Sequence, residues 1–260
     1  MGEAKRKVRS QADLIASEPP CIYCKNRPET VEHMPPITMF RKRARPRGLE
    51  FASCALCNQG TRGADAVASF FSRLHLDYGS GDWQSKEADT LKPILARYAP
   101  GVLQEFTEHG KELHLRIRGV IRPMVGIRAN PLLSANLTVF ASKWGMASYR
   151  EHVGQALPTN GAVYSRWYLN AGPAQQEYDA AMNMMPTFGT LRQGQFQVHD
   201  QFAYRFNSDE RTITATFAKF HQGLYILTIA TAEPDRYLHL APPSQTSAIV
   251  APGELNELLK

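Results

Sequence analysis

All four cysteines of this 260-residue chain lie between positions 21 and 57, in two Cys-x-x-Cys pairs, Cys21–Cys24 and Cys54–Cys57. A disulfide-bonded secreted protein would distribute its cysteines over the whole fold that they crosslink. Two pairs this close together are instead typical of a site in which four thiolates bind one tetrahedral Zn²⁺. We therefore predict a structural zinc on these cysteines. A redox-active thiol pair is the alternative.

Positive charge is concentrated in the same part of the chain. Residues 1–50 contain 11 Lys and Arg against 6 Asp and Glu, whereas the net charge of the whole chain is +6. Such an asymmetry indicates a local surface that binds a polyanion. The sequence contains no apolar run of the length that a membrane helix needs and no secretory signal, so we expect a soluble cytoplasmic protein without a membrane partner.

The segment between the cysteine pairs has a clear order of local patterns. A short run from Thr30 favours a strand, which Pro35-Pro36 must end. A second, short apolar run leads into Cys54, and after Cys57 the residues Val67, Phe70, Phe71 and Leu74 have the i, i+3, i+4, i+7 spacing of an amphipathic helix. The expected order is strand, basic loop, strand and helix.

Residues suited to phosphodiester hydrolysis accompany this order. His33 is the natural general base because imidazole titrates near neutral pH. Glu32 and the side-chain carbonyl of Asn58 are hard oxygen ligands for an ion such as Mg²⁺ or Mn²⁺. Adjacent strand residues point to opposite faces, so Glu32 and His33 share a site only where the strand bends or ends.

The ordered set Cys-x-x-Cys, Glu-His-x-x-Pro and Cys-x-x-Cys-Asn, with Asp65 seven residues further on, resembles the HNH endonucleases, which have the ββα-metal fold in a zinc-containing form. The resemblance covers about residues 21–76. It implies that His33 is the general base, that Glu32 and Asn58 hold the catalytic metal, and that the cysteines hold a separate zinc. Asp65 is either a further metal ligand or a helix cap.

Two positions depart from the family pattern. The family often has an asparagine nine residues before the last ligand, where this chain has Leu49, and a lysine three residues after it, where this chain has Thr61. The first departure puts the orientation of His33 in doubt. Asn58 is itself either a metal ligand or the cap of the following helix.

The basic loop offers five positive charges in seven residues without one acid: Arg41, Lys42, Arg43, Arg45 and Arg47. We expect these residues to contact phosphates, together with Arg62 after the second cysteine pair, although a solvated loop is the alternative. Binding through phosphates weakens with salt and carries no sequence readout.

The expected fold class is α+β, with a basic segment at 1–18, an HNH nuclease domain at 19–78, a larger α+β domain at 83–241 and a tail at 242–260. In the larger domain we expect helices at 88–106 and 131–153 and a strand at 162–169. Three strand-like runs at 196–206, 211–220 and 224–231 predict an antiparallel meander. From 242 the tail should be irregular up to a short helix at 254–259.

The sequence thus predicts a metal-dependent HNH endonuclease that acts on nucleic acid, with DNA preferred. A monomer would nick one strand and a homodimer could cut both. A role in phage defence or in a mobile element fits the habits of the family. An RNase with the same site and a non-catalytic zinc module that binds nucleic acid are the alternatives. The larger domain could select the nucleic acid, form a dimer, or respond to an activating ligand or partner protein.

Overall fold

The computed structural model describes residues 10–17, 20–76, 83–84, 86–108, 110–117, 120–127, 130–170, 172–177, 179, 192–241 and 243–260. The basic residues of 1–9 and the turn-rich stretch 78–82, where we expect the domain boundary, lie outside this set. The protein is a mixed α+β structure, as predicted. Within the described part of the chain, no helix combines the length and the apolar character that crossing a bilayer requires.

The N-terminal region pairs two short strands and follows them with helices. After α1 (Gln11–Ser17), strand β1 (Thr30–His33) pairs antiparallel with β2 (Glu50–Ser53), with Glu32 opposite Phe51 and His33 opposite Glu50. Two single turns of 3₁₀ helix, η1 (Ile37–Met39) and η2 (Arg41–Arg43), lie between the strands. The order strand, basic loop, strand and helix is the one expected from the sequence.

The helix after β2 is divided in two. Helix α2 (Ala55–Gly60) ends at Thr61, whose hydroxyl donates a 2.7 Å hydrogen bond to the Cys57 carbonyl, and α3 (Arg62–Arg73) begins at the next residue. Asn58 therefore lies on a different helix from Asp65. Gly60 and Gly63, on either side of the break, are poor helix formers, which explains the interruption.

The next region contains short elements: β3 (His75–Leu76), β4 (Trp83–Gln84), α4 (Lys86–Asp89), α5 (Lys92–Tyr98) and α6 (Val102–Glu108). The prediction of one helix over 88–106 is therefore wrong. Pro93 lies in the first turn of α5, where a proline needs no hydrogen-bond donor, and Gly101 with φ +91° separates α5 from α6. The hairpin of β5 (Gly110–Ile117) and β6 (Val120–Ile127) follows.

The C-terminal region is a six-stranded antiparallel sheet in the order β12-β7-β11-β10-β9-β8. Its strands are β7 (Ala162–Leu169), β8 (Arg192–Gln193), β9 (Phe202–Ser208), β10 (Ile213–Phe220), β11 (Leu224–Thr231) and β12 (Ser247–Val250). The predicted meander is confirmed as β9-β10-β11, although β9 begins six residues later than expected. The tail is not irregular, because β12 adds an edge strand beside β7 before η4 (Glu257–Leu259).

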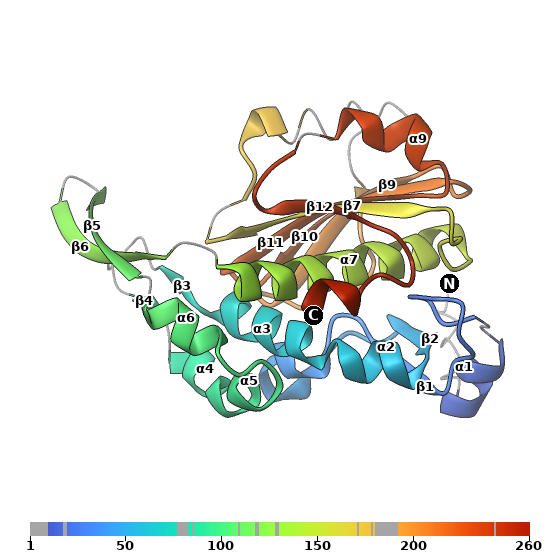
Figure 1. Ribbon diagram of the computed structural model, residues 1–260, viewed down its shortest axis with the longest axis horizontal. Coiled ribbons are helices and arrows are strands. Elements are labelled where there is room, and N and C mark those ends of the chain that lie inside the picture. The colour runs from blue at the N-terminus through green and yellow to red at the C-terminus, as the bar shows by residue number, and fades with distance from the viewer. Residues whose placement is uncertain are drawn as a thin grey trace, which may run out of the picture.

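Helix α7 (Pro131–Val153) lies between this sheet and the N-terminal region (Figure 1). Pro131 occupies its first turn, and Gly154 with φ +88° ends it. The helix is buried on nearly all sides because β7, β10 and β11 cover one side and α3 another. The opposite face of the sheet is covered by α9 (Pro234–Tyr237) and η3 (Leu238–Leu240). One continuous apolar core joins the N-terminal region to the sheet.

Candidate metal centre and active site

The two cysteine pairs meet in space, although 30 residues separate Cys24 from Cys54. The four Sγ atoms lie within 4.8 Å of one another and form no disulfide. The Sγ of Cys24 is 3.7 Å from that of Cys54 and 3.5 Å from that of Cys57. Thiolates bound about 2.3 Å from a tetrahedral zinc are separated by about 3.8 Å. The cluster therefore has the donors and spacing to bind a metal such as zinc.

Backbone N–H groups around the cluster donate to sulfur atoms of the cysteines. Cys54 is the N-cap of α2 and its Sγ accepts a hydrogen bond from the Cys57 N–H, while the Tyr23 N–H points at the Sγ of Cys21. Burial raises the pKa of Cys24 to about 11, and a hydrogen bond with Cys21 raises that of Cys57. In contrast, a side-chain hydrogen bond with Cys57 and backbone hydrogen bonds with Cys54 and Tyr23 lower the pKa of Cys21 to about 5. Metal ions bind thiolates rather than thiols, so this lowering prepares the site for a cation.

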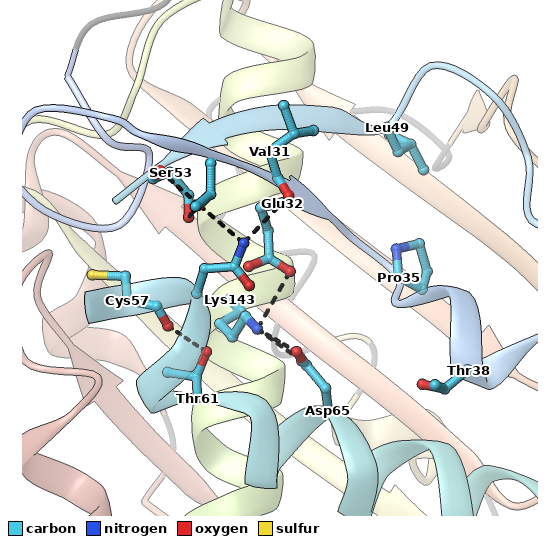
Figure 2. Close-up of polar contacts among 12 residues, drawn as sticks. Val31, Glu32, Pro35, Thr38, Leu49, Ser53, Cys57, Thr61, Asp65 and Lys143 are labelled. Carbon is cyan, nitrogen blue, oxygen red and sulfur yellow. Dashed lines mark hydrogen bonds and ion pairs between the residues drawn. The ribbon is translucent and has the colours of Figure 1, made fainter. Parts of the chain in front are cut away.

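The second acidic cluster lies between β1, α3 and α7 (Figure 2). Glu32 is 3% exposed, and its side chain points from β1 toward α3. There the ammonium of Lys143, from α7, lies 2.7 Å and 2.9 Å from the two oxygens of Asp65 and 3.5 Å from Oε1 of Glu32. The Lys143 side chain is fully buried. We refer to Glu32, Asp65 and Lys143 as the carboxylate–lysine cluster.

Burial dominates the electrostatics of this cluster. Desolvation raises the pKa of Glu32 to about 7, although the positive charge of Lys143 acts in the opposite direction. Lys143 keeps its charge, because Asp65 and Glu32 outweigh its desolvation and raise its pKa. Oε2 of Glu32 is buried and has no hydrogen-bond partner among the described residues. Tyr23, from between Cys21 and Cys24, places its ring 5.6 Å from the Lys143 ammonium.

His33 lies on the other face of the hairpin from Glu32, since adjacent residues of the regular strand β1 alternate. It is half-buried, and its charged neighbours are Arg45 and Glu50. Desolvation and then the positive charge of Arg45 lower the pKa of His33, so the imidazole is neutral at neutral pH. The structure thus brings Glu32 and Asp65 together and leaves His33 on a separate surface.

Asn58 holds α2 against β1. Its amide nitrogen donates to Oγ1 of Thr30 at 3.0 Å and to the carbonyl oxygen of Val31 at 3.3 Å. The Asn58 amide group therefore links the helix that carries Cys57 to the strand that carries Glu32 and His33.

A catalytic divalent ion on Glu32, Asn58 and Asp65 does not fit the geometry around these residues. The ammonium of Lys143 already lies between the two carboxylates, and the amide nitrogen of Asn58 is directed at β1. A catalytic ion also needs open coordination positions for water and phosphate. Glu32 and Lys143 are closed to solvent, so we derive no catalytic step through a metal at this position.

The basic loop divides into an inner and an outer set. The side chain of Arg45 is 5% exposed and donates to the carbonyls of Pro35 and Leu49 and to Glu50, so it holds the loop together. Arg41, Lys42, Arg43 and Arg47 are exposed, and Arg41 forms a 2.7 Å ion pair with Glu87. Lys42, Arg43 and Arg47 are therefore the residues of this loop that are best placed to contact phosphates.

Arg62 is exposed at the start of α3, with its guanidinium 5.9 Å from the ring of Tyr98. It also contributes positive potential at Asp65, though less than Lys143. Its contact with Tyr98 and its exposure are compatible with the predicted contact with nucleic acid.

Lys143 is the site residue that sequence reasoning missed. It is the one charged residue in the apolar stretch from Leu137 to Tyr149 of a long helix. A lone lysine in such a helix indicates a buried ammonium, which requires an acidic partner elsewhere in the chain. The partner itself, 78 residues away, has no signal in the sequence.

No protein-family model, curated protein or solved structure matches this chain significantly. The likeness to HNH endonucleases therefore rests on the motifs and on the order of the elements that carry them.

Proposed function

We propose that this protein is an HNH-type endonuclease that hydrolyses phosphodiester bonds in DNA, with His33 as the general base. One observation carries the proposal. A four-cysteine cluster holds an antiparallel strand pair next to a helix, and the histidine of the Glu-His-x-x-Pro motif is the last residue of the first strand. This is the order of elements expected of a zinc-containing ββα-metal unit.

The environment of His33 suits a general base. Its lowered pKa keeps the imidazole neutral near pH 7, so the ring can accept a proton from a water molecule. The deprotonated water would attack phosphorus in line with the leaving 3′ oxygen.

The exposed residues Lys42, Arg43 and Arg47 supply positive charge on the loop between the two strands. In the proposed complex they hold the phosphates of the nucleic acid and set its position relative to His33. Such contacts fix the position of the sugar–phosphate backbone but do not read the bases. We therefore propose cleavage without a specified target sequence.

The test is the conversion of supercoiled plasmid to nicked and linear forms by zinc-loaded protein, with Mg²⁺, with Mn²⁺ and with EDTA. We expect His33→Ala to lower the cleavage rate by about 10² or more, the range of general base catalysis. The matched control is His199→Ala, because the His199 side chain is 94% exposed and outside the site. Equal rates for His33→Ala and wild type, at equal zinc content, would show that His33 is not the base.

A second candidate is a non-catalytic zinc module that binds nucleic acid. The carboxylate–lysine cluster favours it, because Lys143 already neutralises the acids that the HNH resemblance assigns to the catalytic metal. This candidate predicts salt-sensitive binding to DNA or RNA and no cleavage of either by wild type in any metal. Cleavage of labelled RNA but not DNA would instead assign an RNase.

A further inference from the structure

We propose that Gln201 and His221 of the C-terminal region are positioning residues, which hold the basic loop in the conformation that presents Lys42 and Arg43 to nucleic acid. The inference rests on the proposed function, because it takes Lys42 and Arg43 as residues that contact phosphates. It gives the C-terminal sheet a part in binding that requires no contact between the sheet and the nucleic acid.

The exposed part of the basic loop has a strained backbone. Lys42 and Arg43 follow one another with φ angles of +52° and +59°, in the left-handed region. There the Cβ atom of a residue lies too close to the next carbonyl oxygen, so the conformation persists only where neighbouring structure holds it. Both side chains are exposed, so their own packing does not supply this hold. It must come from the residues on either side.

Two hydrogen bonds from the C-terminal region fix the backbone just before this pair. Nε2 of His221 donates to the carbonyl oxygen of Met39 at 2.7 Å. The backbone N–H of Arg41 donates to Oε1 of Gln201 at 2.6 Å. A third hydrogen bond, 2.8 Å from the N–H of His221 to the carbonyl oxygen of Gln201, joins the two positioning residues. His221 is 3% exposed and Gln201 9%, so little water competes for these bonds.

Packing around these bonds keeps the C-terminal partner in place. The ring of Phe40, the residue between the two bonded positions of the loop, meets that of Phe202 edge to face, with centroids 6.2 Å apart. In the turn between β10 and β11, the N–H of Gly223 donates to the carbonyl oxygen of Ser72 in α3 at 2.9 Å. A Cβ atom at Gly223 would collide with the carbonyl oxygen of Phe71, so this turn lies directly against the backbone of α3. The turn is therefore a fixed support for the loop.

Gln201 is the residue to change first, because it supplies the acceptor for the Arg41 N–H. The carbonyl oxygen of Met39 has a second donor, Nε of Arg73 at 3.4 Å, so it does not depend on the C-terminal region alone. Arg41 also forms an ion pair with Glu87, but both side chains are about half exposed, and ion pairs that exposed contribute little.

Limited digestion with trypsin tests the hold on the loop without nucleic acid, because trypsin cleaves after lysine and arginine in segments that open. In zinc-loaded Gln201→Met, which has lost the acceptor, cleavage after Lys42 and Arg43 should be about tenfold faster than in wild type. This is the change in the opening equilibrium expected when one buried hydrogen bond is lost. Gln201→Glu, whose carboxylate can accept the same N–H, should be protected like wild type. The matched control is Gln222→Met, the same change at an exposed residue of the turn between β10 and β11, which should be cut at the wild-type rate.

His221→Asn is the second variant, should Gln201→Met fail to fold. Asparagine tolerates the φ of +48° at this position, and its shorter side chain withdraws the donor from Met39. This variant should also be cut faster after Lys42 and Arg43. Folded variants that are cut at the wild-type rate would overturn the proposal.

Binding of duplex DNA to the same zinc-loaded proteins tests the consequence for nucleic acid. Gln201→Met should reduce the slope of log K against log salt by up to about 1.8, which corresponds to two phosphate contacts at about 0.9 each. In a protein that already carries Lys42→Ala and Arg43→Ala, it should change the slope no further, whereas a general loss of stability would act in both backgrounds. A wild-type slope in folded Gln201→Met would overturn the proposal.

Failure of the proposed function gives a different result. A wild type that binds no DNA would contradict that function and, with it, the phosphate contacts of Lys42 and Arg43. Trypsin digestion would then still decide whether Gln201 and His221 hold the loop.

Discussion

The N-terminal region contains two clusters of acidic groups, which differ in the cation that balances their negative charge. The four cysteine sulfur atoms lie within 4.8 Å of one another, so four thiolates there would depend on an added metal ion to balance their charge. At Glu32 and Asp65 the chain supplies the cation itself through Lys143. Tyr23 connects the two, because it lies between Cys21 and Cys24 and its ring faces Lys143.

This difference determines which cluster a chelator can disrupt. A metal ion can be removed by a chelator, and the folded state that depends on it then loses its binding free energy. A lysine within the chain cannot dissociate, so the carboxylate–lysine cluster should be insensitive to chelators and sensitive to mutation and pH. The following predictions test this contrast.

The largest effect is expected from loss of a zinc ligand. Cys54→Ser should abolish zinc binding and unfold the β1–β2 pair and α2, because binding of a structural zinc contributes about 10–16 kcal/mol in small zinc-binding peptides. Zinc content and amide hydrogen exchange of residues 30–33 and 50–53 measure this. Full protection of these strands in a zinc-free variant would show that the cluster is not what holds them.

The second-largest effect on stability is expected from removal of the Lys143 ammonium. Lys143→Met should lower the free energy of unfolding in urea, in the absence of divalent ions, by about 3–5 kcal/mol, because it leaves two buried carboxylates without a partner. The matched control is Lys92→Met, which breaks a 2.9 Å ion pair with Asp89 whose side chains are about half exposed. The control should cost about 0–1 kcal/mol.

Adding Glu32→Gln and Asp65→Asn to Lys143→Met should recover most of the lost stability, since no buried charge then remains. A triple variant as unstable as Lys143→Met alone would mean that packing at Lys143, and not its charge, stabilises the fold.

The elements predicted from sequence are those fixed by local signals. The bounds of α7 follow from Pro131 and Gly154 at its ends, and the turn residues His221 to Gly223 place the hairpin of β10 and β11. Strand β12 was missed because its four residues form a strand only through pairing with β7, about 85 residues earlier in the chain.

The site residues likewise divide into those that a local sequence pattern predicts and those that come together only through packing of distant elements. The cysteine cluster could be predicted because the Cys-x-x-Cys spacing defines each half of it locally. The carboxylate–lysine cluster could not, because Lys143 reaches Asp65 across 78 residues and through the packing of α7 on α3. Arg45 shows the same limit, since its charge alone does not reveal that its side chain turns inward to bind Glu50.

Titration of Glu32 gives a smaller effect. Burial holds its folded-state pKa at about 7, above the ordinary value of 4.5. A carboxyl group with a raised pKa adds stability below pH 4.5, and this contribution is lost as the pH rises through about 7. Between pH 5 and pH 8, wild type should therefore lose on the order of 2 kcal/mol relative to Glu32→Gln in urea unfolding. A difference that does not change with pH would show that Glu32 is ionised throughout this range.

The smallest effect concerns the exposed basic residues. Each of Lys42→Ala, Arg43→Ala and Arg47→Ala should reduce the slope of log K against log salt for duplex DNA by about 0.9, as expected for the loss of one phosphate contact. Stability should be unchanged. The control is Arg211→Ala, which removes one exposed charge from the turn between β9 and β10. An equal reduction for the control would show that net charge and not the basic loop drives binding.

The most direct test of the account is the metal inventory of the purified wild-type protein after exposure to zinc and manganese, measured by elemental analysis with X-ray absorption at the zinc edge. The account predicts one zinc per chain, four sulfur ligands at about 2.3 Å, and no manganese that Glu32→Gln removes. A zinc-free protein with Cys21 and Cys24 joined in a disulfide would contradict it, as would a bound manganese that Glu32→Gln removes.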